Sequence, residues 1–393
     1  MKENKTKPDI RFKGFTDDWE QRKLGEIVGI YDGVHQTPKY QDSGIMFLSV
    51  ENISTLQSTK YISEEDFKRD YKVYPQENDI LMTRIGDVGT TNVMTDNTLK
   101  AYYVSLALLK YKNTNPYFLS NAMQSNYVQK GLANRTLKTA VPMKINKDEI
   151  GKVDVILTAA VEEQSKIGSY FKNLDNLITL HQRECNQLKE LKKTMLKKMF
   201  PRDGSNIPEV RFAGFTDDWE QRKLGDVTQI IMGQSPDGST YSETPKDYIL
   251  VQGNSDIKDG WVEPRLWTTQ MTKKADVGDL IMSVRAPAGS MGKTAYNVVI
   301  GRGVAAIKGN EFIFQSLIKK DIEGFWKKIT TGSTFESLNS NDIKNSNLLV
   351  PVNEEQIKIG QYFSQLDNLI TLHQRELEIL KNLKKTCLKR MFI

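Results

Sequence analysis

The 393-residue sequence has only two cysteines and three histidines. Cys185 and Cys387 are too few for a disulfide framework or a four-thiolate zinc site, and neither has a CxxC partner. No run of about 18 apolar residues occurs, and the first ten residues are polar, with three lysines and no signal-peptide core. These absences predict a protein of the reducing cytoplasm that is neither secreted nor bound to a membrane.

Motifs that would support catalysis are missing as well. There is no GxxxxGK[ST] phosphate loop, no GxGxxG dinucleotide turn and no HExxH helix, and three histidines leave no triad or histidine-rich metal centre. Asn115-Pro116-Tyr117-Phe118 resembles the tetrapeptide with which adenine-N6 methyltransferases hold a flipped base. The second proline is absent and no glycine-rich turn for S-adenosylmethionine precedes it, so we interpret this segment as a helix start. The sequence favours binding over catalysis, with no catalytic residue, no metal ligand and no directly bound cofactor.

A tandem duplication dominates the sequence. The segment 11–25, RFKGFTDDWEQRKLG, returns at 211–225 with 14 of 15 residues identical, and the segment 164–184 returns at 356–376 with 17 of 21 identical. Between these repeated blocks only scattered correspondence remains. A repeated frame that carries two different inserts indicates that the chain performs one task twice and meets two different targets. Divergence of a recent duplication, with the frame held by packing alone, is the alternative.

The second repeated block begins a heptad pattern. Apolar residues recur with 3-4 spacing, and neither proline nor glycine interrupts 169–200 or 361–393. Two helices of roughly 30 to 35 residues, about 45 to 50 Å long, are therefore expected. The predicted seam consists of Phe171, Leu174, Ile178, His181 and Leu188 in the first copy and Phe363, Leu366, Ile370, His373 and Leu380 in the second. Cys185 and Cys387 fall on the same seam as core residues.

Each narrow apolar seam needs a partner, and the simplest partner is the other copy. Tandem halves related by a pseudo-two-fold axis would pair the helices antiparallel, although docking onto another polypeptide is also possible. The fold class expected is α+β, with two mixed domains joined by two long helices in an antiparallel coiled coil. The expected boundaries are 1–160 for the first domain, 161–202 for the central helix, 203–352 for the second domain and 353–393 for the last helix.

Charge is concentrated on the predicted helices. The formal net charge is +6, but 164–202 holds nine basic and three acidic residues and 356–393 holds seven and three. The two stretches thus carry +10, which leaves −4 for the rest of the chain. Such positive ends suit a polyanion, and they are also common on ordinary solvated helices.

The inserts combine short strands with polar loops, which is a pattern typical of α+β domains. Arginines at strand exits and polar or basic loop residues can contact bases and phosphates, although such residues also serve structural roles. The candidate DNA-binding residues are Gln36, Lys39, Arg84, Arg135, Lys138, Lys144, Gln234, Arg285, Lys293, Arg302, Ser333 and Thr334.

With its two divergent inserts, repeated FTDDWEQRKLG segments and repeated LDNLITLHQRE helices, the whole chain resembles the specificity subunit of type I restriction-modification enzymes. The resemblance implies two target recognition domains that each read half of a split site in double-stranded DNA. It also implies that the helices space the domains and dock two methyltransferase subunits, which use S-adenosylmethionine. Restriction subunits that use ATP and Mg²⁺ would join through them.

Three alternatives stay open. A self-sufficient methyltransferase or nuclease would need motifs that the sequence lacks. A non-catalytic coiled-coil adaptor would not recognise DNA bases, and an orphan specificity protein would look the same in sequence.

Overall fold

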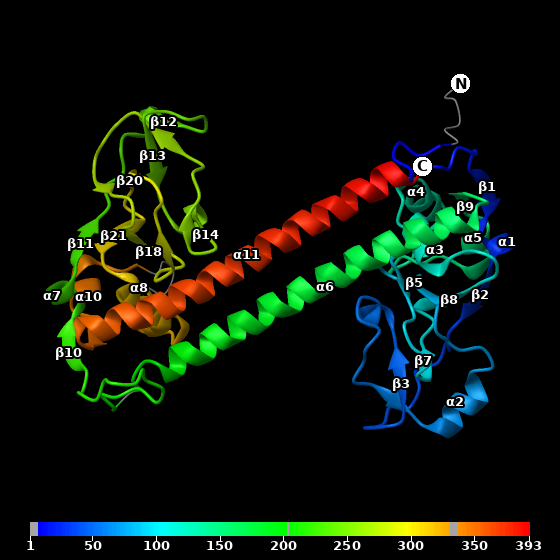
Figure 1. Cartoon of the computed structure of the whole chain (residues 1–393), viewed down its shortest axis with the longest axis horizontal. Coiled ribbons are helices and arrows are strands. Elements are labelled where there is room, and N and C mark those ends of the chain that lie inside the picture. Colours follow the sequence, from blue (N-terminus) through cyan, green and yellow to red (C-terminus); the bar gives the residue numbers. More distant parts are fainter. Residues whose placement is uncertain (1–6, 203, 331–336) are drawn as a thin grey trace. The chain divides into compact units, whose positions relative to one another are not determined.

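A computed structural model describes residues 7–202, 204–330 and 337–393 (Figure 1). The chain divides into two compact units. Unit 1 contains the described residues up to His181 together with Glu376–Ile393, and unit 2 contains Gln182–Arg375. The units cut across both long helices, so they group the residues differently from the sequential boundaries expected above. Ser333 and Thr334 lie outside the described residues.

Unit 1 contains two small sheets and one strand pair. The central sheet has the order β2-β8-β5-β6 and the second sheet the order β4-β3-β7, while β1 pairs with β9. The strands are β1 (Glu20–Lys23), β2 (Val28–Asp32), β3 (Ile45–Leu48), β4 (Tyr61–Ile62), β5 (Ile80–Thr83), β6 (Thr91–Val93), β7 (Lys100–Tyr102), β8 (Leu106–Tyr111) and β9 (Asp154–Leu157). The helices that accompany them are α1 (Leu24–Ile27), α2 (Glu64–Asp70), α3 (Pro116–Met123), α4 (Asn126–Arg135) and α5 (Lys147–Gly151).

The tetrapeptide at 115–118 begins helix α3. Asn115 is the N-cap, and its side chain accepts a hydrogen bond from the backbone nitrogen of Phe118. Pro116 occupies the first turn, where its missing N–H costs nothing. The interpretation of this segment as a helix start is therefore confirmed.

Unit 2 has larger sheets and a similar set of helices. The sheet orders are β11-β21-β18-β19-β15-β14 and β12-β16-β13-β20-β17, with a separate β10-β22 pair. The strands are β10 (Glu220–Lys223), β11 (Gln229–Met232), β12 (Tyr241–Ser242), β13 (Tyr248–Val251), β14 (Ile257–Lys258), β15 (Trp261–Val262), β16 (Trp267–Thr268), β17 (Lys274–Ala275), β18 (Leu280–Ser283), β19 (Met291–Lys293), β20 (Val298–Ile300), β21 (Val304–Lys308) and β22 (Asn347–Val350). The helices are α7 (Leu224–Val227), α8 (Glu311–Ile322), α9 (Phe325–Ile329) and α10 (Ser340–Lys344).

Two long helices follow the domains, as the heptad pattern predicts: α6 (Val161–Lys198) and α11 (Asn353–Met391) (Figure 1). In unit 1, Phe171 of α6 packs on Phe392 just beyond α11, and Asp175 pairs with Lys384. Partner numbers on α11 fall as those on α6 rise, so the two helices run antiparallel in this unit. All ten predicted seam residues are buried or half-buried, and both cysteines are buried.

The first repeated block fastens each domain to its long helix. Arg11 donates two hydrogen bonds to the carboxylate of Glu163, which is fully buried at the start of α6, and Arg211 does the same to Glu355. The hydrogen bond and charge of Glu163 raise the pKa of Arg11 despite its burial. Because both members of each pair are held by two parallel bonds, the frame repeats as a rigid joint.

Tryptophans of the same block complete the joints. Trp19 packs against Phe118 and Phe392 in unit 1. Trp219 packs in the same way against Phe312 and Phe200 in unit 2. The near-identity of the repeated blocks thus reflects one aromatic core built twice.

The α+β class, the two domains and the paired long helices expected from the sequence are confirmed. No helix among the described residues carries an apolar stretch of the length that a bilayer crossing requires.

Candidate nucleic-acid interface

Polar loops gather at one edge of the central sheet in unit 1. Strand register pairs Asp32 with Ala107 and Thr83 with Leu106, so β2 and β5 end where β8 begins. The loops 33–44, 84–90 and 103–105 therefore leave the sheet together, and the segment 136–145 docks on them. We call these four segments the loop edge of unit 1.

Backbone hydrogen bonds hold this loop edge together. The backbone nitrogen of Val34 donates to Tyr102 O, and the backbone carbonyl of Val34 accepts a hydrogen bond from Val104 N. Gly86 N donates to Met143 O with 2.8 Å between the atoms, and Ile145 N donates to Arg84 O at 3.0 Å. A Cβ at Gly33 would collide with the carbonyl oxygen of Tyr102, so this position needs glycine. The loops are thus fixed relative to the sheet.

Unit 2 repeats the arrangement with different residues. Ser283 pairs with Val304 and Met232 with Ala305, so the loops 233–240, 284–290 and 301–303 also leave from one edge. Gln234 N donates to Ile300 O, and Arg302 N donates to the hydroxyl of Ser235. We call these three loops the loop edge of unit 2. Each domain therefore presents a comparable surface built from unrelated side chains.

The loop edges contain eight of the residues predicted to bind DNA. Seven of these eight are exposed, which leaves their polar groups accessible to a ligand. The seven are Gln36, Lys39, Lys138 and Lys144 in unit 1 and Gln234, Arg285 and Arg302 in unit 2.

Arg84 points inward. Its side chain is only 7% exposed, pairs with Asp32 and donates from Nε to Ile145 O at 3.1 Å. The backbone nitrogen of Arg84 donates to Ser105 O, and in unit 2 the backbone nitrogen of Val284 donates to Gly303 O in the same way. Val284 is thus the structural counterpart of Arg84. Arg285 lies one residue later and is exposed, whereas Val284 is buried.

Two further candidates have partners within their own unit. Arg135 pairs with Glu149, with 3.1 Å between the nitrogen and the oxygen. Hydrogen bonds from Lys152, which has the larger effect, and from Arg135 lower the pKa of the Glu149 carboxyl. Lys293 pairs with Glu311 at 2.8 Å, and its ammonium lies over the rings of Trp261 and Phe314. The structure places these two cations in ion pairs within their own units, outside the segments that form the loop edges.

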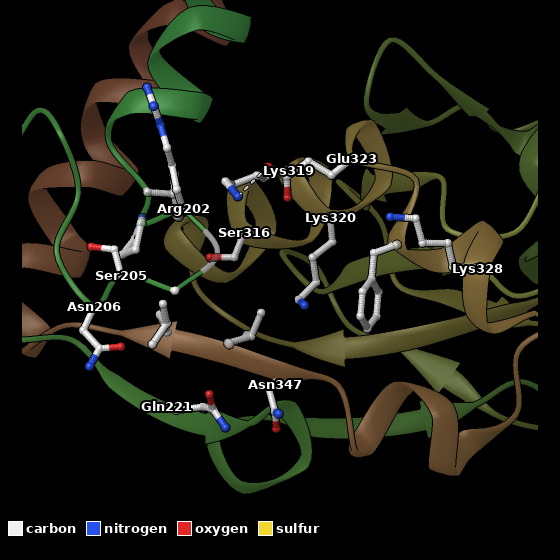
Figure 2. Close-up of a pocket in the computed structure, with 16 residues that line it drawn as sticks. Arg202, Ser205, Asn206, Gln221, Ser316, Lys319, Lys320, Glu323, Lys328 and Asn347 are labelled. Atoms are coloured by element: carbon white, nitrogen blue, oxygen red, sulfur yellow. Dashed lines mark hydrogen bonds and ion pairs between the residues drawn. The ribbon is translucent and has the colours of Figure 1, made fainter.

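A pocket of about 470 Å³ lies in unit 2 between α8, α9 and the β10–β22 pair (Figure 2). Figure 2 shows Lys320 directed into it, opposite Gln221 and Asn347. Lys319 pairs with Glu323 at 2.6 Å, and the ammonium of Lys320 lies 3.9 Å from the centre of the Phe325 ring. No residue of the unit 2 loop edge lines this pocket, so we assign it no part in that surface.

Sequence reasoning missed several exposed apolar residues. Leu137, Val141 and Met143 lie on the loop edge of unit 1, and their neighbourhood has no periodic pattern that would single them out. Other exposed leucines lie on the long helices, where the repeat of LDNLITLHQRE could have identified them. They are Leu177 and Leu180 on α6 and their counterparts Leu369 and Leu372 on α11.

Comparison with known proteins agrees with these observations. A family model for the type I restriction modification DNA specificity domain matches residues 16–190 and again 216–382. A putative type I restriction enzyme specificity subunit, MjaX of Methanocaldococcus jannaschii, is 28% identical, over 94% of this chain and 91% of its own. The MjaVIII specificity subunit of the same organism is 21% identical over the same shares.

Solved structures share the fold. The specificity subunit of a type I restriction-modification system from M. genitalium aligns with a TM-score of 0.73 and 14% identity, over 98% of this chain and 99% of its own. A chain from a structural study of complex assembly in the type I restriction-modification system gives a TM-score of 0.51 and 21% identity, over 94% and 96%. At these identities the likeness concerns the fold alone.

Proposed function

Since the chain belongs to the type I restriction modification DNA specificity family and is a non-catalytic specificity subunit, we propose that its two loop edges read an asymmetric, bipartite site in double-stranded DNA. The main support is that each unit presents an ordered loop edge of the same construction with different side chains. Different side chains on equivalent surfaces favour two different half-sites. Unread base pairs would separate them.

The basic and amide side chains on these edges suit this role. Lys39, Lys138 and Lys144 can bind phosphates, which position a protein on the duplex without reading sequence. Arg285, Gln36 and Gln234 have the donor groups that pair with guanine or adenine edges in the major groove. Each half-site would thus be set by a few exposed side chains on a rigid edge.

Sequencing of DNA methylation in cells that express the chain with its cognate methyltransferase subunit tests this proposal. We expect one methylated motif made of two dissimilar half-sites with a constant gap. A single undivided motif, or a palindromic one, would contradict it. Absence of any sequence preference would favour the coiled-coil adaptor instead.

We further propose that the repeated surfaces dock two copies of the methyltransferase subunit, through which restriction subunits join. Leu177 and Leu180 are exposed on α6, and their counterparts Leu369 and Leu372 are exposed on α11. These exposed leucines repeat at an offset of 192, which a partner that binds the same surface twice would explain. Asp17 and Asp18, like Asp217 and Asp218, are exposed too, but their charges also act on Arg11 and Arg211 within each unit. S-adenosylmethionine, ATP and Mg²⁺ would then be bound by the partners and not by this chain.

Co-purification tests the docking. The paired changes Leu177→Asp and Leu180→Asp should reduce the number of bound methyltransferase subunits from two to one, and adding Leu369→Asp and Leu372→Asp should abolish binding. The matched control is Leu99→Asp, since Leu99 is a similarly exposed leucine outside the repeats. Two bound subunits in the fourfold variant would exclude these surfaces.

A further inference from the structure

The loop edge of unit 1 contains a short ribbon, 137–144, with an apolar tip. Leu137 N donates to Lys144 O at 2.8 Å, which closes the ribbon. Val141 is 99% exposed, and Leu137 and Met143 are 44% and 45% exposed. One short segment thus exposes three apolar side chains, which a ligand with an apolar group would cover.

The base of this ribbon is held firmly. Met143 and Ile145 bond through their backbones to Gly86 and Arg84 at the end of β5, and Ile145 is fully buried. The guanidinium of Arg84 adds a bond to the carbonyl of Ile145 and pairs with Asp32 of β2. The tip is thus presented from a fixed position on the sheet.

Charge identifies the ligand that this tip suits. Lys138 and Lys144 are exposed beside the apolar residues. An apolar centre flanked by cations matches the major groove, where phosphates line the rims and the thymine methyl is the apolar group on the floor.

We propose that Val141 contacts a thymine methyl group in the half-site read by unit 1, with Lys138 and Lys144 on the adjoining phosphates and Arg84 as the positioning residue. This inference rests on the proposed function. The corresponding stretch of unit 2, identified by the equivalent bonds of Ile145 to Arg84 and Leu338 to Val284, has the sequence TTGSTFES at 330–337, without valine or lysine. The combination of Val141 with two flanking lysines therefore has no counterpart in the sequence of unit 2.

Replacing thymine by uracil removes only the methyl group, so it isolates this contact. The assembled complex of the full chain with its methyltransferase subunits is titrated with duplexes that carry one deoxyuridine at each thymine position in turn. One substitution in the first half-site should weaken binding roughly threefold to tenfold, which corresponds to the loss of one buried methyl group. In Val141→Ala the preference for thymine at that position should largely disappear.

Val277→Ala is the matched control, because Val277 is an exposed valine of unit 2 outside its loop edge. It should keep the full preference for thymine. Arg84→Lys should reduce the thymine preference in the first half-site while selectivity at the second half-site is kept, a difference that general destabilisation would not produce. Lys138→Gln should weaken binding to all sequences alike and reduce its salt dependence.

Retention of the thymine preference by Val141→Ala, or the absence of any position sensitive to deoxyuridine, would overturn the contact. Either result counts against the contact only when the wild-type complex is shown to bind a bipartite site. If it binds none, the proposed function itself fails, so the two failures are distinguishable.

Discussion

Lys192 of α6 donates a hydrogen bond to Asp367 of α11, with 2.6 Å between Nζ and Oδ1. In unit 1, Lys384 of α11 makes the same bond to Asp175 of α6. The repeat offset of 192 residues relates the two pairs, because Lys192 of α6 corresponds to Lys384 of α11 and Asp175 of α6 corresponds to Asp367 of α11. His181 with Glu376 and His373 with Glu184 follow the same rule. The helix contacts made within unit 1 are therefore repeated within unit 2 with the roles of the two helices exchanged.

Reversing the charge of Lys192 tests this contact. Lys192→Glu should lower the free energy of unfolding by about 1 kcal/mol or more, because two carboxylates then face each other in a half-buried place. The double variant Lys192→Glu, Asp367→Lys should regain much of this loss. Urea denaturation measures the stability of the double variant and of each single variant, Lys192→Glu and Asp367→Lys. If the effects of the two single changes simply add in the double variant, the two residues do not form a direct pair.

The ion pair between Arg11 and Glu163 should contribute more to the free energy of unfolding than the pair between Lys192 and Asp367 does. Arg11→Met leaves a fully buried carboxylate without its cation, which costs roughly 3 to 5 kcal/mol of unfolding free energy. Arg211→Met should have the same effect on unit 2. Arg22→Met is the control, because Arg22 pairs with Glu26 on the surface and exposed pairs of this kind contribute little to stability. Equal losses for Arg11 and Arg22 would contradict the assigned role.

Alkaline pH should weaken the second sheet of unit 1. Burial raises the pKa of Tyr102 and of Tyr71, whose hydroxyls donate to Asp32 O and Tyr102 O. Below about pH 10, where free tyrosine is protonated, their contribution to stability is complete. As the pH rises above that value the unfolded state releases the protons first, and the contribution is lost.

Urea unfolding between pH 8 and pH 10.5 tests this prediction. The double variant Tyr71→Phe, Tyr102→Phe should lose less stability over this range than the wild type does. Tyr31→Phe, a change at an exposed tyrosine, should behave like the wild type. An equal loss in the double variant would show that other groups cause the alkaline sensitivity.

The length of the two long helices should set the gap between the half-sites, because α6 and α11 each contribute to both units. Seven residues inserted after Arg183 and seven after Arg375 add one heptad to each helix and keep the seam in register. This adds ~10 Å, so the unread gap in the DNA motif should grow by about three base pairs. Methylation sequencing gives the new gap, and an unchanged gap would contradict a spacing role for the helices.

The duplication and the heptad pattern made the frame predictable. Phe171, Leu174 and their counterparts repeat with the period of a coiled coil, and near-identical blocks must make near-identical contacts. The structure of the loop edges was less predictable from the sequence. Whether Arg84 faces inward depends on the phase of a strand end and on Asp32, which lies 52 residues earlier in the chain. No local pattern marks Val141 either, because its exposure arises from a ribbon anchored to distant β5.

Exchange of one insert for the other tests most directly whether the two domains read DNA independently. A chain in which 228–352 is replaced by a second copy of 28–160 keeps both joints and both long helices but carries two identical loop edges. Methylation sequencing of cells that express it with the methyltransferase subunit should then reveal a palindromic bipartite motif, made of the first half-site and its inverted copy. The original asymmetric motif, or two half-sites in direct repeat, would contradict two independent readers on a two-fold frame.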